Sequence, residues 1–90
     1  MIRKYELDAF LEDSGQRTPF HLRISAPEKT KGEDDYFCRV HAPVLFTDDK
    51  QIFGVDEDQA RELALQFVKS MLGGKKLVDQ NGREIDLAKR

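Results

Sequence analysis

The chain has 90 residues, of which 39% are hydrophobic and 36% charged, and its formal net charge is −2. This length predicts a single domain spanning residues 1–90, and a small acidic chain is not expected to bind nucleic acid or an anionic membrane. A single cysteine excludes an internal disulfide and a cysteine-based zinc site. No apolar run is long enough to cross a membrane, and charges interrupt the N-terminal residues throughout, unlike a signal peptide. We therefore expect a cytoplasmic protein.

Three segments alternate between apolar and polar residues, which is the period of half-buried antiparallel strands. They are residues 3–11, 20–26 and 36–42. A fourth strand is expected at residues 50–55 or at residues 44–46. In the first segment, Phe10 is an apolar exception on the polar face.

Residues 57–72 predict an α-helix. Asp56 suits the N-cap, Gln59 stands at the capping-box position, and Gly73 suits the C-terminal stop. One apolar stripe at helical spacing is expected to face the sheet, and it consists of Ala60, Leu63, Ala64, Phe67, Val68 and Met71. Three polar residues are expected to face water, namely Arg61, Glu62 and Gln66.

The residues after the helix predict a short C-terminal β-hairpin. Asn81-Gly82 suits a type I′ turn, which would place Val78 opposite Ile85. Strands followed by a helix, without strand–helix alternation, indicate an α+β fold. We expect an antiparallel sheet of about four strands packed on one helix, with one sheet face open.

The polar faces of the second and third strands carry both histidines and two arginines. In one register that matches the apolar faces, Ile24 lies opposite Cys38, so that His21 faces His41 and Arg23 faces Arg39. Because like charges would then lie opposite each other, this grouping suggests a shallow basic patch that binds an acidic ligand. The alternative is a solvated face in which carboxylates balance the charge.

The first strand can supply such a carboxylate. With Leu7 opposite Ile24, Asp8 would lie opposite Arg23. Two histidines alone are too few for a metal site, so we expect neither a metal nor a cofactor. Cys38 has the apolar parity, opposite to that of His41, and is therefore expected to be a buried core residue rather than a nucleophile.

One stretch resembles a family of small uncharacterised bacterial domains of unknown function. The stretch runs Ile52-Phe53-Gly54-Val55-Asp56, then Gln59-Ala60 and Leu63-Ala64-Leu65-Gln66, and resembles a strand ending in F-G-x-D that enters a helix of the form Q-A-L-x-L-A-L. Arg61 stands where that pattern often has an apolar residue. The resemblance covers about a sixth of the chain and implies no activity. Some small bacterial domains of this layout bind partner proteins, including toxin-neutralising immunity proteins, which is an analogy of fold alone.

Two functions follow as hypotheses. The first is a non-enzymatic interaction module that binds a protein partner, or a second copy in a homodimer, through the open face or an edge strand. Phe10 and Phe37 on the polar face are the expected contacts, surrounded by His21, Arg23, Arg39 and His41. The alternative is an anion-binding domain or minor enzyme that uses those two histidines and two arginines. No catalytic motif is present, so an enzyme is the less favoured reading.

Overall fold

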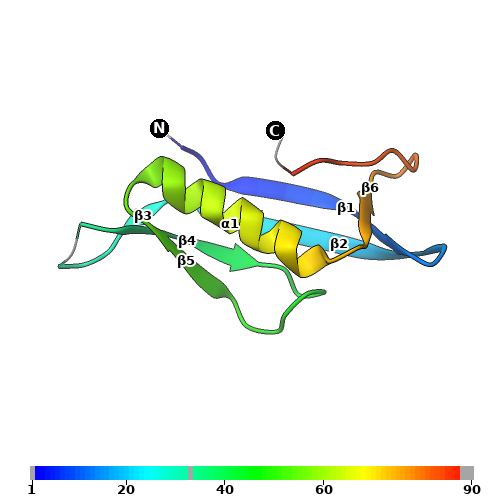
Figure 1. Cartoon of the computed structure of the whole chain (residues 1–90), viewed down its shortest axis with the longest axis horizontal. Helices are drawn as coiled ribbons and strands as arrows, with labels where there is room; N and C mark the ends of the chain where they lie inside the picture. The colour runs from blue at the N-terminus through cyan, green and yellow to red at the C-terminus, as the bar shows by residue number, and fades with distance from the viewer. Residues whose placement is uncertain (1, 33, 88–90) are drawn as a thin grey trace.

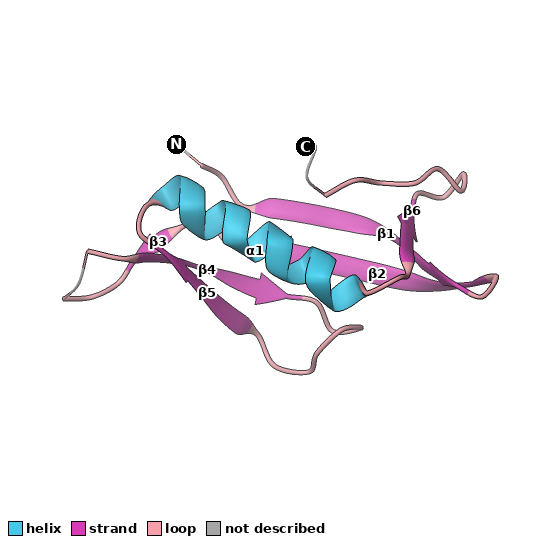
Figure 2. Cartoon of the chain, viewed as in Figure 1, coloured by secondary structure: helices cyan, strands magenta, loops and turns pink. Residues whose placement is uncertain are grey.

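The computed structural model describes residues 2–32 and 34–87. Its elements are, in chain order, β1 (Tyr5–Asp13), β2 (Gln16–Ile24), β3 (Glu28–Lys29), β4 (Tyr36–His41), β5 (Lys50–Gly54), α1 (Glu57–Leu72) and β6 (Lys76–Val78). The helix lies across one face of an antiparallel sheet (Figure 1), and Figure 2 shows that no other described helix covers the sheet. The α+β prediction and the helix bounds are therefore confirmed. In the described part of the chain, no helix has the length and apolar character needed to span a membrane.

The sheet is wider than the four strands expected. Its strands follow the order β6-β1-β2-β4-β5, and every pair is antiparallel. Since β5 occupies one edge of β4 from Tyr36 to Val40, the short β3 shares the other edge with β2. The fourth strand forms at Lys50–Gly54, while residues 43–45 form a turn in which Leu45 N donates to Ala42 O at 2.9 Å.

A two-residue turn sets the register of β1 and β2. Ser14 and Gly15 both have positive φ, 53° and 81°, as a type I′ turn requires. The turn places Leu7 opposite Leu22 and Asp8 opposite His21. The predicted pairs of Leu7 with Ile24 and Asp8 with Arg23 were wrong by two residues, because both strands continue to the turn itself.

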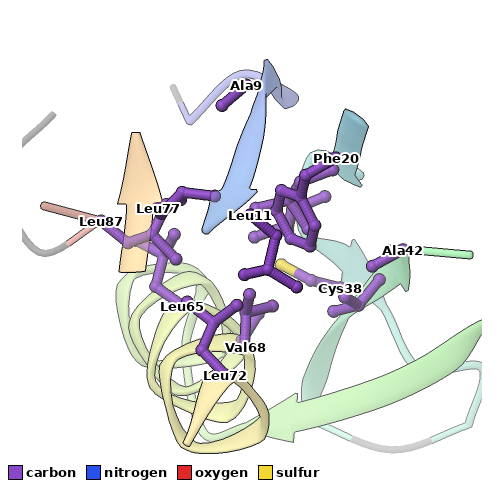
Figure 3. Packing of buried hydrophobic residues seen from close by; sticks show 14 of the residues in the cluster. Ala9, Leu11, Phe20, Cys38, Ala42, Leu65, Val68, Leu72, Leu77 and Leu87 are labelled. Carbon is purple, nitrogen blue, oxygen red and sulfur yellow. The ribbon is translucent and has the colours of Figure 1, made fainter. Parts of the chain in front are cut away.

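The core lies between α1 and the covered face of the sheet. Figure 3 shows Leu65, Val68 and Leu72 of the helix facing Leu11, Phe20 and Cys38 of the sheet. Phe20, Leu22, Ile24, Cys38 and Val40 are all fully buried. The predicted burial of Cys38 is confirmed, and alternation along the strands placed the covered face correctly.

The helix is rotated relative to its predicted stripe. The row Ala60, Ala64 and Val68 is buried as expected, but Leu63 and Met71 are 36% and 44% exposed. Three residues outside the predicted stripe are buried instead, namely Arg61, Leu65 and Leu72. Because the central row is common to two overlapping stripes, helical spacing alone does not tell which flank packs on the sheet.

Both ends of the helix are capped as the sequence predicts. The Asp56 carboxylate accepts a hydrogen bond from Gln59 N at 2.7 Å, and Gln59 Oε1 accepts one from Val55 N at 2.8 Å. Gly73 ends the helix with a positive φ of 63°. At the entry, a Cβ on Gly54 would lie 2.5 Å from Ala60 N, so only glycine lets β5 approach the helix this closely.

The C-terminal segment joins the main sheet through β6. Phe10 lies opposite Val78, and Val78 bridges to Glu84 rather than to the predicted Ile85. Of the predicted type I′ pair, only Gly82 has a positive φ, so that turn does not form. The Asp79 carboxylate accepts hydrogen bonds from the backbone N–H groups of Asn81 and Arg83 instead, which makes the loop longer and shifts the register.

Candidate functional site

All six residues proposed from the sequence project from the open face of the sheet. Phe10 comes from β1, and the others lie on β2 and β4, namely His21, Arg23, Phe37, Arg39 and His41. The structure does not assemble them into one site. On β1, Phe10 lies between Pro19 of β2 and Val78 of β6. On β4, Phe37 lies between Glu28 of β3 and Phe53 of β5, at the other side of the sheet.

The predicted pairing of like charges does not occur. Arg23 lies opposite His41, and Ile24 lies opposite Val40. The expected His21–His41 and Arg23–Arg39 pairs were wrong because the strands are displaced by two residues, a shift that keeps every side chain on its face. Ser25 sits opposite Arg39, whose backbone N–H donates to Ser25 Oγ at 2.8 Å, and this contact supports the observed register.

Each of the four basic side chains has a carboxylate partner. The pairs are His21 Nδ1–Asp8 Oδ1 at 2.6 Å, Arg23 Nε–Glu6 Oε2 at 3.6 Å, Arg39 Nε–Glu28 Oε2 at 3.1 Å and His41 Nδ1–Asp49 Oδ1 at 2.7 Å. All of these side chains are about half exposed, so the pairs add little stability. An anion would have to displace an existing carboxylate, and the arrangement matches the charge-balanced face that was the alternative interpretation.

The shortest of these pairs, between His21 and Asp8, lowers the pKa of the Asp8 carboxyl group. The hydrogen bond from His21 holds the pKa of the Asp8 carboxyl below its ordinary value of 3.8, and the positive charges of His21 and Arg23 act in the same direction. Asp79 likewise has a lowered pKa, chiefly because its carboxylate accepts the backbone N–H of Arg83. Both shifts favour the ionised form of the carboxyl group.

A small hollow lies where β1, β2 and β4 meet on this face. It has a volume of about 210 Å³ and is lined by residues that include Arg23, Arg39 and His41 together with Glu6 and Asp49. The lining thus combines both signs of charge. The hollow is smaller than the cavities that usually hold a small molecule, which are about 300–1,000 Å³.

An aromatic patch lies on the same face, at the side of the sheet that ends with β5. The rings of Phe37 and Phe53 are 5.6 Å apart at an angle of 39°, and the Arg39 guanidinium lies 5.5 Å from the Phe37 ring centre. Phe53 is 48% exposed, and Val55, two positions along, is 67% exposed. We use the name aromatic patch for Phe37, Phe53 and Val55.

Phe53 and Val55 were missed as candidate contact residues. Both share the parity of Gln51 in the predicted fourth strand, which is the polar parity of that strand. This pattern was a signal that they would be exposed. Phe10, by contrast, is only partly exposed, and Val78 opposite it is 2% exposed, so the neighbouring edge strand already covers part of this side chain.

Both ends of the sheet have edges available for pairing. In the described part of the chain, no strand pairs with the outer edge of β5. On the opposite side, β6 pairs only with Phe10–Glu12 of β1, so residues 6–9 of β1 pair with β2 alone among the described strands. Exposed edges of this kind can form hydrogen bonds with another chain.

The structure favours no nucleophile or metal centre on this face. Cys38 lies on the covered face, away from His41, and burial raises the pKa of its thiol while the nearby Arg61 guanidinium opposes that rise. A protonated thiol is a weak nucleophile. Among residues 2–32 and 34–87, no group of three or more histidine, cysteine or carboxylate side chains could hold a metal ion.

No protein-family model matches the chain, and no match is found among curated proteins or among solved structures. The resemblance to a family of small bacterial domains therefore stays a prediction.

Proposed function

We propose that this protein is a non-enzymatic interaction module that forms a homodimer through the outer edge of β5. The observation that carries the proposal is the aromatic patch beside an unpaired edge strand. Contact surfaces are enriched in aromatic and arginine side chains, and here Arg39 stacks on Phe37 within the patch.

The β5 segment is complementary to a second copy of itself. In an antiparallel pairing centred on Phe53, Lys50 of one copy would lie opposite Asp56 of the other. Asp56 itself has extended backbone angles, but β5 ends at Gly54, the chain bends at residues 55–56, and the Asp56 carboxylate caps α1, so this contact would lie just beyond the paired strand. The same pairing would place the two Phe53 rings side by side and join both aromatic patches across a two-fold axis. A two-fold axis uses the same patch on both copies, which is the commonest symmetry of small oligomers.

Light scattering behind gel filtration, over a series of protein concentrations, tests the homodimer. We expect a dimer mass for the native protein and a monomer mass for Phe53→Lys, because the two lysines would lie side by side across the two-fold axis and repel each other. Met71→Lys is the matched control, since Met71 on α1 is 44% exposed and lies outside the patch. A dimer that survives Phe53→Lys would show that β5 is not the interface.

A monomeric native protein at every concentration would overturn the homodimer. The interaction module would then need a different protein as its partner, and affinity capture of the tagged protein from its native host would test that version. Loss of the captured partner in Phe53→Lys but not in Met71→Lys would assign it to the aromatic patch.

Anion binding on the histidine–arginine face stays the alternative. Its support is the hollow at Arg23, Arg39 and His41, and the carboxylate already paired with each basic group opposes it. A phosphate titration followed by NMR tests it. Anion binding would be supported if phosphate shifted the NMR signals of His21, Arg23, Arg39 and His41. Unchanged signals at all four residues would contradict it.

We also infer a cytoplasmic location. Small domains of oxidising compartments commonly rely on disulfides, whereas this chain has one cysteine, and it is buried in the core. Recovery of the protein from an extracytoplasmic fraction of its native host would contradict this inference.

A further inference from the structure

A second cavity lies between the N-terminal segment and α1, and it shares Lys4 and Tyr5 with the hollow of the open face. It has a volume of about 620 Å³, within the range of small-molecule sites, which is about 300–1,000 Å³. Its walls include Ile2, Arg3 and Tyr5 from the N-terminal segment, and Arg61, Glu62 and Leu65 from the helix. The cavity lies beside the first half of β1, where β6 does not reach.

Arg61 is the one charged or polar residue that is buried among those the structure describes, with 3% of its surface exposed. Its Nη2 donates hydrogen bonds to the backbone carbonyls of Arg3 and Ser25. Its Nε is buried and has no hydrogen-bond partner. No carboxylate of the described residues forms an ion pair with this guanidinium, in contrast to the arginines of the open face.

Burying a cation without a neighbouring anion lowers the stability of the folded state. Moving a charge out of water carries a large penalty unless a partner of opposite charge and further hydrogen bonds compensate for it. An arginine side chain stays protonated inside a protein, so it cannot relieve this penalty by losing its proton. The two carbonyl oxygens and the nearby Cys38 thiol satisfy part of the guanidinium, which leaves its Nε without a hydrogen-bond partner and its charge without a described carboxylate.

The rest of the cavity wall also favours an anion. Besides Arg61, the lining carries three basic residues, Arg3, Lys4 and Lys69, against two acidic ones, Asp58 and Glu62. Lys4 and Lys69 already have carboxylate partners, Glu6 at 3.7 Å and Asp86 at 3.9 Å, so Arg3 and Arg61 are the basic groups of the wall that form no ion pair with a described carboxylate. An anionic ligand would complement this region.

We propose that this cavity binds a small organic monocarboxylate, with the Arg61 guanidinium as the partner of the carboxylate. The planar fork of a guanidinium matches a carboxylate, and Ile2, Tyr5 and Leu65 offer apolar surface for the body of the ligand. Asp58 and Glu62 repel a second negative charge, which disfavours a phosphate dianion. The site does not depend on β5 or on the homodimer.

NMR titration with sodium benzoate and sodium hexanoate as probes tests the proposal. Both should shift backbone signals at Tyr5, Leu65 and Gln66 and the Arg61 Nε–H signal, with saturation at millimolar concentration. Benzamide, which has the shape of benzoate without its charge, and inorganic phosphate should each bind at least about tenfold more weakly, because charge-assisted bonds to the guanidinium supply the affinity. The proposed site would be overturned if neither benzoate nor hexanoate shifted these signals, or if benzamide shifted them as much as benzoate does.

Variants separate a binding role of Arg61 from a structural one. Arg61→Met should weaken benzoate binding by about tenfold or more, whereas the matched change Arg23→Met on the open face should leave it unchanged. Unchanged affinity in a folded Arg61→Met protein would contradict the proposal.

Arg61→Met also removes the bonds to Arg3 and Ser25 and could unfold the chain, so a second variant is needed. Glu62 is exposed, and Glu62→Gln removes a like charge from the cavity wall. It should tighten benzoate binding by about two- to fivefold, in keeping with the loss of one screened repulsion. Weaker or unchanged binding in Glu62→Gln would count against the site. Phe53→Lys should bind benzoate normally, so failure of the homodimer and failure of this site are distinguishable.

Discussion

The two faces of the sheet are built from the same strands and obey different constraints. On the covered face, Phe20, Leu22 and Val40 are fully buried, and any register that keeps them on that face buries them. On the open face, Arg23 and His41 meet because of one particular register, and a shift of two residues gives every charge a new neighbour. Burial therefore depends on the parity of a residue, whereas its polar contacts depend on its exact pairing.

The arginines show the same contrast. Arg39 on the open face has both a carboxylate and an aromatic ring beside it. Arg61 on the covered side is buried, and no described carboxylate pairs with it. Carboxylates of the chain thus balance the basic groups on the open face, whereas no described carboxylate balances Arg61. A ligand is therefore proposed at the cavity beside Arg61 and not on the open face.

The largest expected effect compares one phenylalanine from each face. Phe20→Ala should lower the free energy of unfolding by about 3–5 kcal/mol, because it empties a fully enclosed site in the core. Phe53→Ala should lower it by less than about 1 kcal/mol in the monomer, since the ring is 48% exposed. Urea unfolding at low protein concentration measures both. Equal losses would mean that the aromatic patch belongs to the core of the monomer.

A smaller effect is expected where β5 meets the helix. Gly54→Ala should lower the free energy of unfolding by about 1–3 kcal/mol, because the added Cβ would lie 2.5 Å from Ala60 N and force the helix away. Gly74→Ala is the matched control, since a Cβ there meets nothing within 4 Å. The control should be neutral or slightly stabilising. A neutral Gly54→Ala would show that the helix does not pack as tightly on β5 as the structure has it.

The smallest effect concerns an ion pair of the open face. Because the pKa of Asp8 in the folded protein lies below its ordinary value of 3.8, the pair stabilises the fold above that pH. The contribution is lost as the pH falls through the lowered pKa. His21→Gln should raise the pKa of Asp8 toward 3.8, as followed by NMR titration of its carboxyl carbon, with little change in stability at neutral pH. An unchanged titration would show that His21 does not hold this carboxylate.

The fold was largely predictable because its signals are local. Alternation along the strands identified the buried face, and Asp56, Gln59 and Gly73 marked the ends of the helix. The candidate site was predictable only in part. Parity placed all six proposed residues on the open face, but it could not tell that Phe37 would meet Phe53 or that Phe10 would be partly covered by β6.

The sequence by itself determined that three strands and one helix form, and which strand residues face the core, because periods of 2 and 3.6 residues are properties of single segments. Only the tertiary structure decided the registers, the rotation of the helix and the burial of Arg61. These depend on contacts between segments, and each alternative satisfied the same local pattern. A two-residue turn at Ser14-Gly15 selected one register, and docking of the helix selected one flank, so that the arginine predicted to face water became the buried cation of the cavity.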